Sequence, residues 1–223
     1  IEAAADEPFV LAAGRTVSGV SIGVSFPDAG DSGMHDVLKR ADLALYVAKD
    51  LPGSAHAFHT DALARVKVEL MQMQQDIISG LREGQFFLEY QPVVDCSDGT
   101  VESCEALVRW LHPTRGLMAP ESFLPIAESC GQIPALGRWV VGEAIREAAG
   151  WPVHIGVSVN LSGGEFRDPG FVRYICDELA LHGLAPERLT VEVTETVLVN
   201  DKGPVRDGLA ELRRGGVRIT LDD

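Results

Sequence analysis

The strongest constraint in this sequence is a regular alternation, from residue 85 onward, between short β-prone runs and segments whose apolar residues recur every three or four positions. The expected strands are Gln85–Asp95, Glu102–Trp110, His154–Asn160, Leu189–Thr194 and Val217–Leu221. The expected helices are Pro120–Cys130, Ala135–Ala149, Gly170–His182 and Pro204–Arg214. Parallel strands need a crossover connection, which is usually a helix. The alternation therefore predicts an α/β fold with a parallel sheet or barrel.

The residues before this alternation predict a separate unit. Thr16–Phe26 has a β-rich composition and ends at a Pro-Asp turn, and His35–Asp50 has the apolar spacing of an amphipathic helix. Asp61–Gly84 is helical in pattern throughout. We expect a first domain over 1–60, a connector helix over 61–84 that leads into the barrel, and a second domain over 85–223.

The composition limits the classes of function. The chain has 223 residues, 46% of them hydrophobic, and a net charge of −14. That charge argues against DNA or RNA as partners and against attraction to an anionic membrane, because both carry dense negative charge. No apolar run is long enough to span a bilayer, and the acidic start lacks the basic region of a signal peptide. We expect a cytoplasmic location and no membrane contact from this stretch.

The four cysteines point to neither a zinc site nor a disulfide framework. Their spacing includes no C-x-x-C pair, and they stand far apart at Cys96, Cys104, Cys130 and Cys176. Cys104 is expected to point away from the side of its strand that carries Glu105, because successive side chains in a strand alternate.

Oxygen-bearing side chains stand late in the expected strands or just after them. Glu105, Asn160, Glu192 and Asp222 follow one another at steps of 55, 32 and 30 residues. A (β/α)₈ barrel repeat takes roughly 30 residues, and the C-terminal ends of its strands meet at one mouth. Oxygen donors of this kind suit Mg²⁺ or Mn²⁺. Two alternatives stay open: Asn160 as the cap of the turn that follows, and Glu105 with Arg109 as a surface ion pair.

Six short motifs give these residues a family context. In order, they are Tyr90-Gln91-Pro92, Glu105-Ala106-Leu107-Val108-Arg109-Trp110, Phe123-Leu124-Pro125-Ile126-Ala127-Glu128, Val159-Asn160-Leu161-Ser162, Glu192-Val193-Thr194-Glu195 and Asp222-Asp223. In order and approximate spacing they resemble EAL-type cyclic di-GMP phosphodiesterases, over about residues 66 to 223. The resemblance implies an incomplete TIM-like (β/α)₈ barrel whose first strand is antiparallel.

The resemblance also implies a two-metal site. Glu105, Asn160, Glu192 and Asp222 would hold the first Mg²⁺ or Mn²⁺, and Asp222 would bridge to a second ion that Asp223 helps to hold. Glu105, Asp222 and Asp223 are thereby the implied catalytic residues. Gln91 and Arg109 would contact the cyclic dinucleotide, and Glu195 would steady a neighbouring loop without touching the metals.

The first unit resembles a different family. Val20-Ser21-Ile22-Gly23-Val24 and the helical run from Arg40 to Lys49 are similar to the C-terminal third of diguanylate cyclase (GGDEF) domains. The catalytic Gly-Gly-Asp-Glu-Phe hairpin of that family is absent, so no cyclase activity is expected. The fold expected for residues 1–60 is therefore a partial α+β domain of this type, with Lys49 as a solvated residue at a helix end.

Taken together, the resemblances imply a bacterial signalling protein that hydrolyses cyclic di-GMP to linear pGpG. The family continues beyond the equivalent of Asp223 with a Phe-Gly-Thr-Gly segment and later supplies a Lys and a Glu near the attacking water. The activity is therefore expected of the full-length parent, and the 223 residues alone are expected to be inactive. The alternative is a non-catalytic cyclic di-GMP receptor. A homodimer, and membrane anchoring through other segments, are compatible with the family for the full-length protein.

Overall fold

The computed structural model describes residues 8–11, 14–16, 18–49, 51, 53–195 and 203–222. The chain divides into two compact units, Ile1–Gln72 and Met73–Asp223. In the described residues, no helix combines the length and the apolar character needed to cross a membrane.

In its described residues, the first unit holds two small two-stranded sheets and one complete helix. Its elements are β1 (Phe9–Leu11), β2 (Gly14–Thr16), β3 (Ser21–Val24), α2 (Met34–Lys49) and β4 (Ala55–Phe58). The expected β-rich run and helix are present, whereas β4, which pairs in parallel with β3, was not predicted. Gly23 lets α2 lie directly on β3, because a Cβ there would come 2.0 Å from the carbonyl oxygen of Ala41. Lys49 is exposed at the end of α2, as expected.

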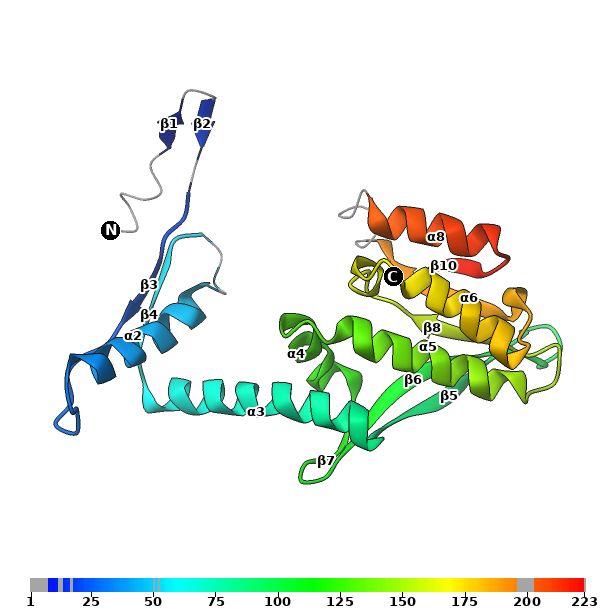
Figure 1. The fold of residues 1–223 in the computed structure, drawn as a ribbon, viewed down its shortest axis with the longest axis horizontal. Helices are drawn as coiled ribbons and strands as arrows, with labels where there is room; N and C mark the ends of the chain where they lie inside the picture. The colour runs from blue at the N-terminus through cyan, green and yellow to red at the C-terminus, as the bar shows by residue number, and fades with distance from the viewer. Residues whose placement is uncertain are drawn as a thin grey trace. The chain divides into compact units, whose positions relative to one another are not determined.

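The helix α3 (Asp61–Glu83) follows, and the second unit continues with alternating strands and helices (Figure 1). Its strands are β5 (Phe86–Val94), β6 (Val101–His112), β7 (Gly116–Met118), β8 (Gly156–Asn160), β9 (Leu189–Thr194) and β10 (Arg218–Asp222). Its α-helices are α4 (Leu124–Ser129), α5 (Ile133–Ala149), α6 (Phe171–His182) and α8 (Pro204–Arg214). Short 3₁₀ turns are η1 (Pro120–Ser122), η2 (Glu165–Arg167) and η3 (Pro186–Arg188).

One mixed sheet organises the second unit. Its strand order is β10-β9-β8-β6-β5, and β7 pairs with β6 beside this path. The strands β6, β8, β9 and β10 are parallel, whereas β5 runs antiparallel to β6. The predicted parallel α/β arrangement is confirmed, as is the antiparallel first strand implied by the resemblance. Among the residues that the structure describes, the sheet does not close into a barrel.

Local sequence signals explain where the helices of this unit begin and end. Pro134 and Pro204 lie in the first turns of α5 and α8, where a missing N–H costs no hydrogen bond. Gly183 ends α6 in the left-handed conformation, with φ of 66°. The predicted helix over residues 120–130 is instead split into η1 and α4, because Pro125 can start a helix but would break its interior.

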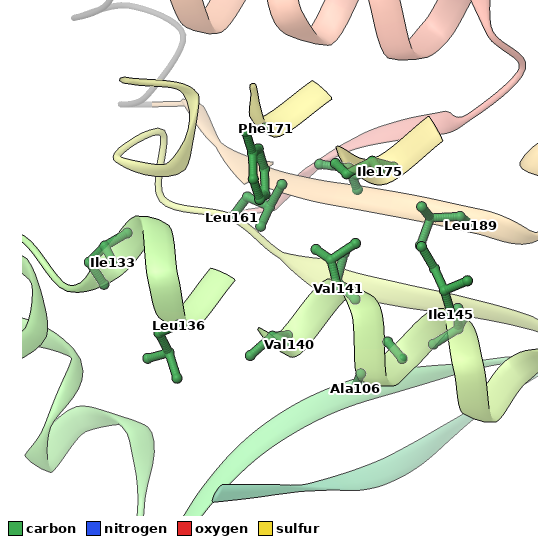
Figure 2. Close-up of a cluster of buried hydrophobic side chains, with 14 of the residues drawn as sticks. Ala106, Ile133, Leu136, Val140, Val141, Ile145, Leu161, Phe171, Ile175 and Leu189 are labelled. Atoms are coloured by element: carbon green, nitrogen blue, oxygen red, sulfur yellow. The ribbon is translucent and has the colours of Figure 1, made fainter. Parts of the chain in front are cut away.

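The core lies between the sheet and its helices. In Figure 1 the helices α5, α6 and α8 cover one side of the sheet. Figure 2 shows Val141 and Ile145 of α5 gathered with Ala106 of β6 and Leu189 of β9, and all four are buried. Burial of each of the three larger side chains, Val141, Ile145 and Leu189, contributes about 1.5–3 kcal/mol to stability. This layer therefore holds the strands in register.

An aromatic cluster fixes the far end of β6. Trp110 is fully buried, stacks on Phe86 at 5.0 Å between ring centroids and meets Phe123 edge-on at 5.6 Å. Trp110 is therefore a packing residue. His112 ends β6, is only 4% exposed, and its Nε2 lies 3.1 Å from Asp76 Oδ2 on α3.

Candidate functional site

The register of the parallel strands brings three of the predicted site residues to one face of the sheet. Glu105 on β6 is the partner of Ser158 on β8, and Asn160 follows Ser158 by two positions. Asn160 is in turn the partner of Glu192 on β9. Residues two apart in a strand, and residues paired between strands, point to the same side of a sheet. Glu105, Asn160 and Glu192 therefore share one face, near the C-terminal ends of neighbouring strands.

A direct contact joins two of these side chains. Asn160 donates a hydrogen bond from Nδ2 to Oε1 of Glu105 at 2.7 Å, although the two residues are 55 positions apart in the chain. The Asn160 amide thus meets Glu105, and this contact replaces the alternative in which Asn160 caps the turn after β8. A carboxylate acceptor makes this hydrogen bond stronger than one between neutral groups.

Asp222 belongs to the same face of the sheet by register. Thr220 of β10 is the partner of Glu192, and Asp222 lies two positions further along the strand. The side chain of Asp222 and the whole of Asp223 lie outside the described part of the chain. The backbone therefore places Asp222 at the predicted edge, whereas the metal-bridging roles of Asp222 and Asp223 stay predictions.

Gln91 and Arg109 extend this face toward β5 and toward the end of β6. Gln91 is exposed and is the antiparallel partner of Glu105. Arg109 lies four residues after Glu105 on the same strand, which places their Cα atoms about 13 Å apart at a rise of roughly 3.3 Å per residue. A ligand held by both Glu105 and Arg109 would have to bridge that distance.

Arg109 forms an ion pair, but not with Glu105. Its Nε donates to Oε2 of Glu89 on β5 at 2.7 Å, and its Nη1 donates to the carbonyl oxygen of Val108 at 3.0 Å. The alternative of a Glu105–Arg109 surface pair is therefore wrong, because that separation lies beyond the reach of a salt bridge. Sequence analysis missed Glu89. The sequence offers one hint, which is that Glu89 and Gln91 lie two positions apart and so face the same side of one strand. The register with β6 is needed to connect Glu89 to Arg109.

The opposite face of the same strands is apolar and packs against the helices. Ala106, Val159 and Val191 are buried there, at 4%, 0% and 0% exposure. Cys104 lies on this side, as expected, and burial raises the pKa of its thiol. All four cysteines are free. Glu105 and Arg109 therefore lie on one face of β6, and Cys104, Ala106 and Trp110 lie on the other.

A pocket of about 450 Å³ opens beside Asn160. Its polar rim comprises Glu121, Glu128, Asn160, Ser162, Glu165, Glu192 and Thr194, and its apolar wall comprises Ala106, Leu107, Val108, Pro120, Leu124, Pro125, Ile133, Leu136, Gly137, Val140 and Leu161. A cavity with an apolar wall and a few converging polar groups is typical of a small-molecule site.

Glu165 is a buried carboxylate at this pocket that sequence analysis missed. It is 5% exposed, and its Oε2 accepts hydrogen bonds from the backbone N and the Oγ of Ser162, both at 3.1 Å. Burial raises the pKa of Glu165, although the hydrogen bonds from Ser162 oppose that shift. The side chain also lies against α5, since a Cβ on Gly137 would come 2.5 Å from Cγ of Glu165. Glu165 therefore fixes the turn that follows Asn160.

The donor set suits a hard divalent cation. Glu105 supplies carboxylate oxygens, and the Asn160 amide needs only to rotate by 180° to present Oδ1 in place of Nδ2, a change that hardly moves its heavy atoms. In the described residues, no three His, Cys, Asp or Glu side chains come close enough to form a metal site by themselves. Glu195 follows β9 and is exposed. The oxygen donors present fit Mg²⁺ or Mn²⁺, while the full ligand set stays a prediction.

These features define an α/β protein with a mixed, mostly parallel sheet, in which acidic and amide side chains meet near a pocket at the C-terminal ends of the parallel strands. Residues 72–223 match the EAL domain family, and the chain belongs to that family. The match begins at residue 72, so the GGDEF-type interpretation of residues 1–60 stays a prediction.

The chain is also similar to known signalling proteins. The chain is 37% identical over 206 residues to a signaling protein of Caulobacter vibrioides, with 92% of this chain and 25% of that protein covered. It is 33% identical to MucR of Pseudomonas aeruginosa, a bifunctional diguanylate cyclase/cyclic di-GMP phosphodiesterase, with 97% of this chain and 32% of MucR covered. The chain thus spans about a third or less of the length of these two relatives.

A solved structure of the PaMucR phosphodiesterase in complex with c-di-GMP is similar to this fold. The TM-score is 0.64 with 37% sequence identity, over 68% of this chain and 63% of that one. The likeness supports the α/β arrangement of strands and helices in the second unit.

Proposed function

We propose that the full-length protein hydrolyses cyclic di-GMP to linear pGpG at the C-terminal edge of the β5–β10 sheet. One observation carries the proposal: Glu105, Asn160 and Glu192 share a face of the sheet, and Asn160 and Glu105 are in contact at 2.7 Å. Membership of the EAL domain family, and the ligand and activity named for MucR, support this choice of substrate.

In this proposal Glu105, Asn160, Glu192 and Asp222 hold one Mg²⁺ or Mn²⁺, and Asp222 and Asp223 hold a second. Ions bound there would supply Lewis acidity, lowering the pKa of water and offsetting charge on the phosphodiester. Glu195 steadies the segment after β9 without contacting the substrate.

The other proposed contacts bind and orient the dinucleotide. Gln91, exposed and paired with Glu105, donates a hydrogen bond to the substrate. Arg109 offers a guanidinium to a phosphate oxygen, which is a strong, charge-assisted interaction. These local groups explain how a chain with a net charge of −14 would bind an anionic ligand.

The test compares the full-length protein with its Glu105→Gln variant. Linear pGpG is measured by chromatography after incubation with cyclic di-GMP and Mg²⁺ or Mn²⁺. We expect the variant to lose activity by at least about a hundredfold, since it loses a charged ligand at the proposed site. Glu102→Gln is the matched control: Glu102 is an exposed carboxylate on the same strand, three residues away, and its removal should leave the rate unchanged.

Two results would count against this function. Equal rates for wild type and Glu105→Gln would contradict the proposal. Tight binding of cyclic di-GMP by the full-length wild type without any turnover, measured by calorimetry, would identify the protein as a receptor instead.

The same proposal includes the organisation and setting of the protein. Residues 1–60 are the C-terminal part of a GGDEF-type domain without cyclase activity, 61–84 connect it to the barrel, and 85–223 are the N-terminal part of the EAL domain. The full-length protein acts as a homodimer on the cytoplasmic side of the cell. Analytical ultracentrifugation of the full-length protein tests the dimer, and a monomer at micromolar concentration would contradict it.

A further inference from the structure

The ion pair between Glu89 and Arg109 links the two strands that carry the proposed dinucleotide contacts. Glu89 stands two positions before Gln91 on β5, and the register partner of Glu89 is Leu107 on β6. The pair with Arg109 is therefore diagonal and lies on the polar face of the sheet. The Arg109 side chain is 20% exposed and that of Glu89 is 50% exposed. The guanidinium is thus largely sheltered, whereas its carboxylate partner is open to solvent.

The guanidinium is held at two points. Its Nε donates to Glu89 at 2.7 Å, and its Nη1 donates to the Val108 carbonyl oxygen at 3.0 Å. Among the residues that the structure describes, Nη2 of Arg109 has no hydrogen-bond partner. A planar group fixed through two of its nitrogens has one orientation, and the end of the fork that carries Nη2 remains available to an oxyanion.

We propose that Glu89 is a positioning residue, which fixes the plane of Arg109 so that Nη2 meets a phosphate oxygen of the dinucleotide. This inference rests on the proposed function. The stabilising effect of an exposed ion pair on a fold is small, because solvent screens it. The main effect of Glu89 is therefore on ligand affinity: an arginine that is already ordered loses less conformational freedom when it binds phosphate.

Glu89 also has an effect of opposite sign. Its negative charge lies close to the expected phosphate and would weaken binding by repulsion. Two substitutions separate orientation from charge. Glu89→Ala removes both the charge and the acceptor for Nε, while Glu89→Gln removes the charge but keeps an oxygen that can accept the same hydrogen bond.

The experiment measures kcat and KM of the full-length protein with cyclic di-GMP, together with the dissociation constant by calorimetry. We expect Glu89→Ala to raise KM and the dissociation constant by about two- to tenfold, the range expected for one side chain that must be ordered on binding, with kcat changed less than twofold. Glu89→Gln should keep both constants at or below the wild-type values. Adding Glu89→Ala to an Arg109→Ala background should have no further effect. Glu102→Ala, on the same strand as Arg109, is the control.

Other outcomes overturn the inference or separate it from the proposed function. If both Glu89 variants lower KM, the carboxylate only repels the ligand. If Glu89→Ala leaves KM unchanged in an active protein, or lowers only the melting temperature, the pair is structural. If the wild-type protein binds cyclic di-GMP without turnover, the hydrolysis proposal fails. The dissociation constants of wild type and the Glu89 variants then test the role of Glu89 in place of KM. A wild type that neither binds nor hydrolyses cyclic di-GMP overturns the function and this inference together.

Discussion

Replacing Glu105 by Gln separates the role of this residue in stability from its role in metal binding. Among the described residues, Glu105 accepts one side-chain hydrogen bond, from Nδ2 of Asn160 at 2.7 Å. A Gln side chain keeps an oxygen acceptor, so only the charge-assisted part of that bond is lost. Hydrogen bonds to charged groups contribute about 1 kcal/mol more than neutral ones, and partial exposure reduces the difference. The metal-free variant should therefore unfold with a free energy within about 1 kcal/mol of wild type.

The metal response should differ strongly between the two proteins. A ligand present at 100 times its dissociation constant stabilises the folded state by about 2.7 kcal/mol. For a unit of the size of Met73–Asp223, about 1 kcal/mol corresponds to roughly 2–4 °C, so wild type should gain about 5–11 °C. If Gln weakens the site by about a hundredfold, the same metal concentration gives about 0.4 kcal/mol, or about 1–2 °C.

The assay is thermal unfolding of the full-length protein with and without Mn²⁺, followed by tryptophan fluorescence. In this chain Trp110, Trp139 and Trp151 all lie in the second unit, so they report on the sheet that carries the site. Glu102→Gln is the control and should keep the full metal-dependent shift. The reasoning is refuted if Glu105→Gln retains the wild-type shift, or if the metal-free variant loses more than about 2 kcal/mol.

Three further predictions concern the packing around this site. Trp110→Ala should lower the free energy of unfolding by about 3–5 kcal/mol in urea titrations, because it leaves a cavity in the aromatic cluster at the end of β6. A loss below about 1 kcal/mol would contradict the packing described. His112 accepts N–H hydrogen bonds from the next turn at Nδ1, so its proton lies on Nε2 and is donated to Asp76. Asp76→Ala should lower the free energy of unfolding by about 1–3 kcal/mol because it removes the partner of that buried donor, and Asp76→Asn, which keeps an acceptor oxygen, should lower it less. Equal losses for the two variants would argue against the hydrogen bond. The raised pKa of Glu165 means that its contribution to stability is present below the pKa of the unfolded state and is lost as pH rises through the folded-state pKa. Glu165→Gln should therefore gain stability relative to wild type in urea titrations as pH rises above the ordinary pKa of a Glu side chain, and a difference independent of pH would show that the carboxyl group is not perturbed.

Much of the fold was predictable because the relevant signals are local. Leu189–Thr194 and Pro204–Arg214 were predicted with the bounds that the structure has, since Pro204 marks a helix start and the apolar runs have a clear period. The short strand β7 was missed, because a strand of three residues depends on its pairing with the end of β6. The same dependence on distant partners hid β4, which pairs with β3.

The candidate site was predictable in its residue types but not in its contacts. The spacing of Glu105, Asn160 and Glu192 indicated a shared edge, and the register of the strands agrees with that expectation. The partner of Arg109 was not predictable, because Glu89 lies on another strand and only the register of the antiparallel pair brings them together. The position of His112 was not predictable for a similar reason, because its burial against Trp110 and its contact with α3 depend on distant parts of the chain.

The alternation along β6 has a consequence for how this protein tolerates change. The side chains of Ala106 and Trp110 pack into the interior, whereas those of Glu105 and Arg109 face the other way. Adjacent positions of this strand therefore contribute either to packing or to the site. A saturation scan of this strand, scored separately for abundance and for activity in cells, should yield two interleaved patterns with a period of two residues. Variation at one set can alter the residues of the site while the packing of the interior stays intact.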